Sequence, residues 1–252
     1  MRVSFALLLV SALVFAGCGR RHVARRQLPP PPMPQQGTAT SSNTERGKVP
    51  PAKSSQPAET EQDAEKNYRG VKPIYTETGI ASWYGTVYHH RRAANGEIYD
   101  QNGLTAAHKT LPLNSTVRVT NLSNDKSVLV RITDRGPFVG DRVIDLSLGA
   151  AKIIGLYLPG TARVRVDVLE SPKDIASGGR WCVQIGAFDS YEKAAQLKEK
   201  LLQRYRTAKV LQFTGPTGEW LRVRVFEDNK QRAYEVAKET RAPEGVFVVR
   251  LD

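Results

Sequence analysis

The clearest pattern in the chain is an alternation of apolar and polar positions over residues 128–134. A period of two predicts a half-buried strand. One face holds Val128, Val130 and Ile132, and the other holds Leu129, Arg131 and Thr133. By this parity Asp134 lies on the apolar side, just before a Gly-Pro turn. A partly desolvated carboxyl has a raised pKa and suits a general acid. The alternative is an aspartate that only caps the turn.

Further short strands surround this one. Alternation and glycine-bounded apolar runs predict strands over 79–85, 117–120 and 162–168. Ser147 is a suitable N-cap for a short helix over 148–154, and Gly155 ends that helix. Many short strands with one small helix indicate a compact, mainly β barrel.

The C-terminal part of the chain has a different order of elements. The predicted strands cover 181–187, 209–213, 220–226 and 246–251, and the predicted helices cover 191–205 and 230–241. Asp189 with Glu192 resembles a capping box for the first helix, and Asn229 is a suitable cap for the second. The order βαββαβ predicts an α+β unit with one sheet and both helices on a single face.

Strand parity assigns different roles to the two faces of this sheet. The side chains predicted to face the helices are those of Val183, Ile185, Leu221, Val223 and Val225. The opposite face, which the pattern leaves uncovered, presents Gln184, Arg222, Arg224 and Phe247. Amide, guanidinium and aromatic groups suit sugar hydroxyls and sugar rings. The alternative is an ordinary solvated sheet face.

The N-terminus predicts export. Arg2, an apolar run over 3–15 and Ala16-Gly17-Cys18 are typical of a bacterial lipoprotein signal, in which residues 1–17 are removed and Cys18 is lipidated. An ordinary secretory peptide is the alternative. Residues 18–75 predict a disordered tether, because they are rich in Pro, Ser, Gln and charged groups. The expected folded domains are 76–170 and 180–252, with a linker over 171–179.

The net charge of +12 does not point to nucleic acid. Residues 1–75 carry 11 Lys and Arg against 5 Asp and Glu, so half of the excess lies in the leader and tether. The folded regions are only mildly basic, and an exported protein meets anionic envelope polymers and lipid head groups. With Cys18 lipidated, Cys182 is the only remaining thiol, which leaves no internal disulfide.

Five segments in the first folded region together resemble one family. They are 79–85 (GIASWYG), 94–97 (ANGE), 104–112 (LTAAHKTLP), 134–138 (DRGPF) and 144–147 (IDLS). In this order they resemble the rare lipoprotein A family, endolytic peptidoglycan transglycosylases built on a double-psi β-barrel. Residues 183–188 (VQIGAF), followed by a helix rich in Ala and Leu, resemble the SPOR domain, a peptidoglycan-binding module.

The resemblance implies a lytic transglycosylase that cleaves the bond between N-acetylmuramic acid (MurNAc) and N-acetylglucosamine (GlcNAc). The muramic C6 hydroxyl attacks C1, which leaves 1,6-anhydro-MurNAc ends, and strands lacking stem peptides are preferred. Asp134 matches the catalytic acid/base, Glu97 the second carboxylate and His108 a positioning residue. From the residues alone, a solvated loop acid is the favoured interpretation of Glu97, and His108 is equally a structural histidine. Tyr84 stacks on sugar or belongs to the barrel core.

No cofactor is expected. His89, His90, His108 and Glu97 match no compact metal-binding spacing, so no metal is predicted. The chain departs from the family pattern at His90, where a glycine is usual, and at Ala93, where a threonine is usual. Loss of a glycine reshapes a loop that needs positive φ, which bears on substrate fit.

The sequence thus predicts a lipid-anchored, periplasm-facing enzyme of the cell envelope. Gly19 after Cys18 favours the outer membrane over the inner one. The expected partners are peptidoglycan glycan strands, the membrane and the cell-division machinery, and not nucleic acid. The competing hypothesis is a peptidoglycan-binding envelope lipoprotein without catalytic activity. A third is an expansin-like loosening module with the same barrel and aspartate.

Overall fold

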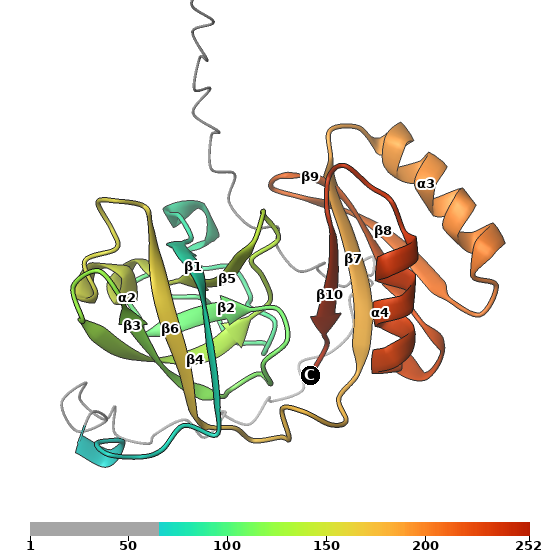
Figure 1. Cartoon of the computed structure of the whole chain (residues 1–252). Coiled ribbons are helices and arrows are strands. Elements are labelled where there is room, and N and C mark those ends of the chain that lie inside the picture. The colour runs from blue at the N-terminus through green and yellow to red at the C-terminus, as the bar shows by residue number, and fades with distance from the viewer. Residues whose placement is uncertain (1–65) are drawn as a thin grey trace, which may run out of the picture.

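The computed structural model describes residues 66–252, which form two domains side by side (Figure 1). The expected leader, Cys18 and most of the tether lie outside the described residues. None of the helices in the described part is long and apolar enough to cross a membrane.

The first domain is a closed barrel of six strands in the order β1-β5-β2-β4-β3-β6, which confirms the expected barrel. The pairs β1/β5 and β2/β4 are parallel, and the other pairs are antiparallel. Its elements are β1 (Tyr75–Trp83), the 3-10 turn η1 (Thr86–Tyr88), β2 (Thr105–His108), β3 (Thr116–Asn121), β4 (Ser127–Asp134), β5 (Arg142–Leu146), α2 (Leu148–Ile153) and β6 (Thr161–Glu170).

The barrel interior is filled by aliphatic side chains. Alternate residues of β4, Val128, Val130 and Ile132, point into this core, as their period of two predicts. The Ser147 hydroxyl accepts a hydrogen bond from the Ala150 amide and caps α2. The sequence pattern did not reveal β2 and β5, which have only four and five residues.

The second domain has the predicted βαββαβ order and a four-stranded antiparallel sheet, β10-β7-β9-β8. Its elements are β7 (Trp181–Phe188), α3 (Tyr191–Arg204), β8 (Lys209–Gly215), β9 (Gly218–Arg224), the 3-10 turn η2 (Phe226–Asp228), α4 (Lys230–Glu239) and β10 (Val246–Arg250). Asn229 caps α4 as predicted. The N-cap of α3 is Ser190, and the predicted capping box that begins at Asp189 is wrong.

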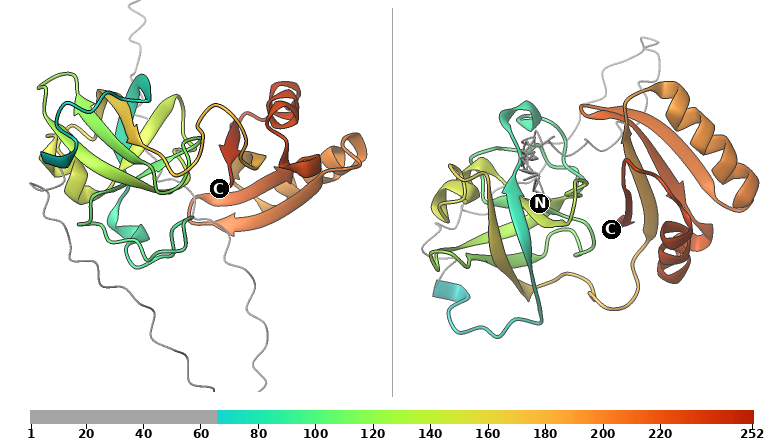
Figure 2. Two further views of the ribbon diagram at one scale, coloured as in Figure 1. Left: turned by 90° about the horizontal axis from the view of Figure 1, so that it is seen from below. Right: turned by 45° about the horizontal axis from the view of Figure 1, so that its top comes forward.

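The two faces of this sheet have different neighbours. The five residues predicted to face the helices belong to the core beneath α3 and α4. Figure 1 shows both helices on the side of the sheet away from the barrel, and the two views of Figure 2 show the other side turned toward the barrel. The expectation that this second face is uncovered is therefore wrong.

Candidate active site

Asp134 lies at the end of β4, where a register shift moves it out of line with the barrel core. Ala106 pairs with Ile132, but the next residue, Ala107, pairs with Asp134, so Thr133 is an extra residue in the bulge. Residues opposite one another share a face of the sheet. Because Ala107 packs with tyrosines rather than with the core aliphatics, Asp134 shares that outer layer. The predicted position of Asp134 on the side of Ile132 is thus wrong.

The Asp134 carboxylate is half-buried and held by two main-chain amides. Its Oδ1 accepts hydrogen bonds from the amides of Arg135 (2.8 Å) and Ala94 (3.1 Å). Burial raises the pKa of Asp134 to about 6, although the two hydrogen bonds and the Arg135 charge oppose this shift. The carboxyl therefore exists in both protonation states near neutral pH, as an acid that later serves as a base requires.

Three tyrosines cover Ala107 beside Asp134. The Tyr84 ring lies 4.6 Å from that of Tyr99 and 6.2 Å from that of Tyr88, measured between centroids. All three side chains are buried. The Tyr84 hydroxyl lies beside the Thr105 side chain and the Tyr99 hydroxyl beside the Leu148 main chain, but within residues 66–252 none of the three hydroxyls makes a hydrogen bond of good geometry. Tyr84, predicted to contact sugar or to lie in the barrel core, belongs to this separate cluster. Buried hydroxyls without a protein partner are places where water or a ligand hydroxyl binds.

Glu97 is joined to the same strand end through a loop. The Asn95 amide donates to the Thr133 carbonyl (3.0 Å), so the loop that carries Glu97 crosses the end of β4. Both terminal nitrogens of Arg131 donate hydrogen bonds to the Glu97 carboxylate, one to each oxygen, with N···O distances of 2.7 Å. The side chains are about half exposed, at 51% for Glu97 and 41% for Arg131. Hydrogen bonding from Arg131 lowers the pKa of Glu97, which is ionised at neutral pH.

A pocket of about 260 Å³ opens beside this ion pair. Glu97, Arg131 and Thr133 line one part of it, and Tyr99 and Thr105 line another. Tyr99 joins this pocket to the tyrosine layer, but Asp134, Tyr84 and Tyr88 do not line it. Ionised Glu97 in the pocket and protonatable Asp134 at the adjacent strand end are the kinds of group that acid/base chemistry needs.

His108 lies at the end of β2 and is only 3% exposed. Its Nδ1 accepts hydrogen bonds from the amides of Thr110 (3.1 Å) and Leu111 (2.9 Å). Nδ1 therefore carries no proton, and Nε2–H donates to Glu77. Burial lowers the pKa of His108, which favours the neutral ring. With both nitrogens occupied, the imidazole shapes the turn after β2 and has no free atom for a substrate.

Asp145 is a second buried carboxylate in this layer. It lies on β5 and pairs in register with Ala107, on the side opposite Asp134. Arg142 donates to its Oδ2 at 3.1 Å, and Oδ1 has no partner among the described residues. Burial raises the pKa of Asp145 to about 6. Nothing local in the sequence reveals this position, because the pairing of β5 with β2 joins residues far apart in the chain.

The predicted sugar-binding face of the second domain is largely covered. Gln184 is 1% and Arg222 7% exposed, and Arg222 donates to the Gln184 side-chain oxygen at 2.9 Å. Arg224 is half-buried and paired with Asp228, and Phe247 packs against Phe138 of the barrel. Of these four residues, Arg224 keeps the most accessible charged group, with 38% of its side chain exposed.

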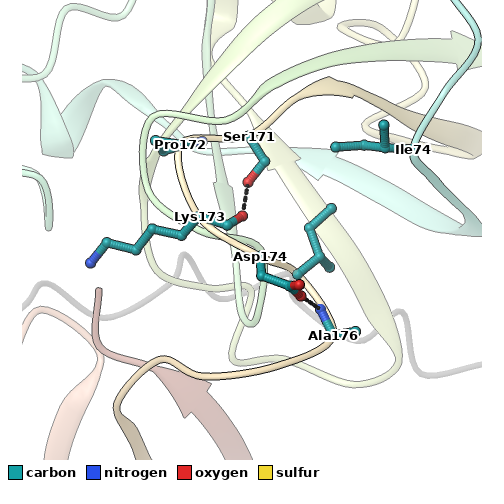
Figure 3. Close-up of a pocket in the computed structure, with 7 residues that line it drawn as sticks. Ile74, Ser171, Pro172, Lys173, Asp174 and Ala176 are labelled. Carbon is teal, nitrogen blue, oxygen red and sulfur yellow. Dashed lines mark hydrogen bonds between the residues drawn. The ribbon is translucent and has the colours of Figure 1, made fainter.

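Other features lie away from Asp134. A hollow of about 450 Å³ at the linker is lined by Ile74 and residues 171–176, and Figure 3 shows its turn closed by hydrogen bonds of Ser171 and Asp174. None of the predicted site residues lines it.

Among residues 66–252 no group of three His, Cys, Asp or Glu side chains is placed to hold a metal ion. His90 adopts φ 64°, the left-handed conformation that glycine favours.

The comparisons with known proteins agree with this architecture. Residues 76–166 match the family described as lytic transglycolase, with a double-psi β-barrel, and residues 177–249 match the SPOR domain. The "Endolytic peptidoglycan transglycosylase RlpA" of Pseudomonas aeruginosa PAO1 is 59% identical over 106 residues, which are 42% of this chain and 31% of the relative. The Vibrio cholerae protein of the same name is 41% identical over 161 residues, 60% of this chain and 61% of the relative.

A solved structure of Clavibacter michiganensis expansin resembles the chain at a TM-score of 0.33 and 14% identity, covering 69% of this chain and 78% of that one. A similarity this low carries no functional argument.

The barrel, its carboxylates and the βαββαβ sheet define a double-psi β-barrel protein with a SPOR domain. More specifically, the chain is similar to the relatives named endolytic peptidoglycan transglycosylase RlpA, in agreement with the resemblance to the rare lipoprotein A family. It spans from about a third to about three fifths of the length of the relatives named above.

Proposed function

We propose that this protein is a lytic transglycosylase that cleaves the MurNAc–GlcNAc bond of peptidoglycan. The observation that carries the proposal is the pair of carboxylates tied to one loop with opposite pKa shifts. The Ala94 amide of this loop donates a hydrogen bond to Asp134, whose pKa is raised. The same loop carries Glu97, whose pKa is lowered. Such divergent environments are how one site holds an acid and an anion at the same pH.

In this mechanism protonated Asp134 donates its proton to the glycosidic oxygen as the C1–O bond breaks. The muramic C6 hydroxyl attacks C1, and the resulting Asp134 carboxylate takes the hydroxyl proton, which restores the acid. No water enters, and the product ends are 1,6-anhydro-MurNAc. Ionised Glu97 stabilises positive charge at C1 or assists proton transfer. His108 acts as a positioning residue through the turn at Leu111. A sugar contact of Tyr84 belongs to the same proposal and requires its buried side chain to become accessible.

The second domain delivers the enzyme to its substrate in this proposal. The match to the SPOR domain and the similarity to the family support binding to glycan strands that lack stem peptides. Gln184, Arg222, Arg224 and Phe247 remain the proposed contacts, and Arg224 is the most accessible charged group among them. The protein then works in the cell envelope and faces the periplasm. Lipidation of Cys18, an outer-membrane location and a cell-division partner belong to the same proposal.

The test is incubation of the full chain with purified glycan strands lacking stem peptides, with mass spectrometry of the products. We expect 1,6-anhydro-MurNAc ends from the unmodified chain and none from Asp134→Asn. Asp125→Asn is the matched control, because Asp125 lies in an exposed turn of the same domain at φ 56°, which Asn tolerates. Reducing MurNAc ends would indicate hydrolysis instead. Strand binding without any cleavage would leave the non-catalytic, peptidoglycan-binding alternative.

A further inference from the structure

The segment that follows Asp134 is seated on the sheet of the second domain. The Phe138 ring centroid lies 5.7 Å from that of Trp220 and 5.6 Å from that of Phe247. Phe138 is buried together with Trp220, Cys182 and Val249 in one apolar cluster. These three partners all belong to the second domain and lie on the sheet face that α3 and α4 do not cover. Burial of two large aromatic side chains makes this contact favourable.

Arg135, the neighbour of Asp134, connects the domains through its guanidinium. One terminal nitrogen donates to the carbonyls of His108 (3.1 Å) and Leu111 (2.7 Å) in the barrel. The other donates to the main-chain oxygen of Asp252 in the second domain, at 2.7 Å. The residue is 1% exposed. Burial lowers the pKa of Arg135 to about 10, so the group keeps its charge at neutral pH.

Asp252 is itself held in place from several directions. Its carboxylate accepts hydrogen bonds from Lys173 Nζ (2.7 Å), the Arg180 amide (3.0 Å) and Arg250 Nε (3.1 Å). Lys173 comes from the linker, where its side chain points away from the hollow (Figure 3). The Arg250 amide also donates to the Lys109 carbonyl of the barrel, at 3.0 Å. The oxygen that receives Arg135 is therefore fixed by the linker and the second domain together.

We propose that the second domain positions the catalytic loop, with Arg135 as the positioning residue that transmits its placement to Asp134. This inference rests on the proposed function. The Arg135 amide binds Asp134 Oδ1, while its guanidinium is anchored on Asp252 and its loop is anchored through Phe138. A displacement of the sheet therefore moves the amide that orients the acid. While the barrel and the sheet are in contact, the second domain therefore helps to form the catalytic site and does not only bring the enzyme to its substrate.

The decisive variant is Asp252→Ala, which lies in the second domain and touches no reacting atom. It keeps the main-chain oxygen that Arg135 binds but removes the carboxylate that holds this residue in place. We expect kcat for cleavage to fall about 10- to 100-fold with KM little changed, because small misplacements of a catalytic group are costly. Phe138→Leu, which keeps an apolar side chain, is expected to lower kcat in the same direction. The matched control is Asp189→Ala, since Asp189 forms an exposed ion pair with Lys193 in the second domain.

Docking is measured independently through Cys182, which is fully buried and lies in one apolar cluster with Phe138 of the barrel. In a chain carrying Cys18→Ser it is the only thiol. We expect slow labelling of Cys182 in the otherwise unmodified chain and faster labelling in Asp252→Ala, with the melting temperature confirming a folded protein. Rapid labelling of the unmodified chain would overturn the docked arrangement. Faster labelling of Asp252→Ala with unchanged or increased kcat would overturn the positioning role.

A substitution of Arg135 separates positioning from charge. Arg135→Lys keeps the charge that lowers the Asp134 pKa but loses the bridge to Asp252, so kcat falls while the pH dependence of cleavage stays in place. Arg135→Gln also shifts the pH profile upward. If Arg135→Lys has the same kcat as the unmodified chain, Arg135 acts only through its charge, and the proposal fails. Absence of cleavage by the unmodified chain would instead reject the proposed function, while the Cys182 measurement still tests docking.

Discussion

The carboxylates of Asp134 and Asp145 lie on the two strands that flank β2, and both residues pair in register with Ala107. Burial raises the pKa of each to about 6. The layer outside the barrel core thus carries two carboxyls that resist ionisation, with the Tyr84 ring near both. This arrangement has consequences for stability as well as for catalysis.

Asp134→Asn is expected to stabilise the protein at pH 7 and to change little at pH 4. The folded pKa is raised from 3.8 to about 6, so the folded state binds more protons than the unfolded state between these values, and stability falls as pH rises through them. Asn removes this cost, up to about 3 kcal/mol. Its Oδ1 still accepts both amides. Urea unfolding at both pH values measures the difference, and an equal difference at both would contradict the assignment.

Arg131→Met is expected to abolish most cleavage while lowering the free energy of unfolding by less than about 1 kcal/mol, because exposed ion pairs contribute little to stability. Without Arg131, Glu97 loses both of its charge-assisted hydrogen bonds and its fixed position. The control is Arg232→Met, since the Arg232–Glu235 pair is similarly exposed and lies on α4. If both variants lose cleavage equally, or if neither loses it, the Arg131–Glu97 pair has no role in cleavage.

At pH 7 the His108 ring is expected to be neutral with its proton on Nε2. Two amides donate to Nδ1, which excludes a proton there. Long-range nitrogen–proton NMR of the ring distinguishes the tautomers, and an Nδ1–H signal would contradict the structure. His108→Ala leaves two amides without an acceptor and is expected to cost about 3 kcal/mol. The exposed His90→Asn serves as the control, because Asn tolerates positive φ.

Gly149→Ala is expected to destabilise the barrel by about 1 to 3 kcal/mol, as overpacking does. A Cβ at Gly149 would lie 2.5 Å from the Asn102 carbonyl oxygen, in the loop that follows the Tyr99 segment. Gly85→Ala is the matched control, since nothing lies within 4 Å of its Cβ position and its φ is ordinary. Thermal unfolding compares them, and equal melting temperatures would show that the Asn102 loop moves freely.

The sequence alone determined the elements whose signals are local. The alternation over 128–134 predicted β4, and the caps at Ser147 and Asn229 predicted the starts of α2 and α4. Helix-facing residues such as Val183 followed from strand parity, because a period of two records which side is buried. The motifs also indicated the two domain types, because residue types and their order can be recognised without knowledge of distances.

Only the tertiary structure decided how these parts meet. The bulge opposite Ala107 depends on the register between β4 and β2, which moves Asp134 from the barrel core to the tyrosine layer. The covering of Trp220 by Phe138 depends on how two domains pack. Register and domain packing arise from contacts between residues far apart in the chain, and the periodicity of a single strand contains no information about its partner.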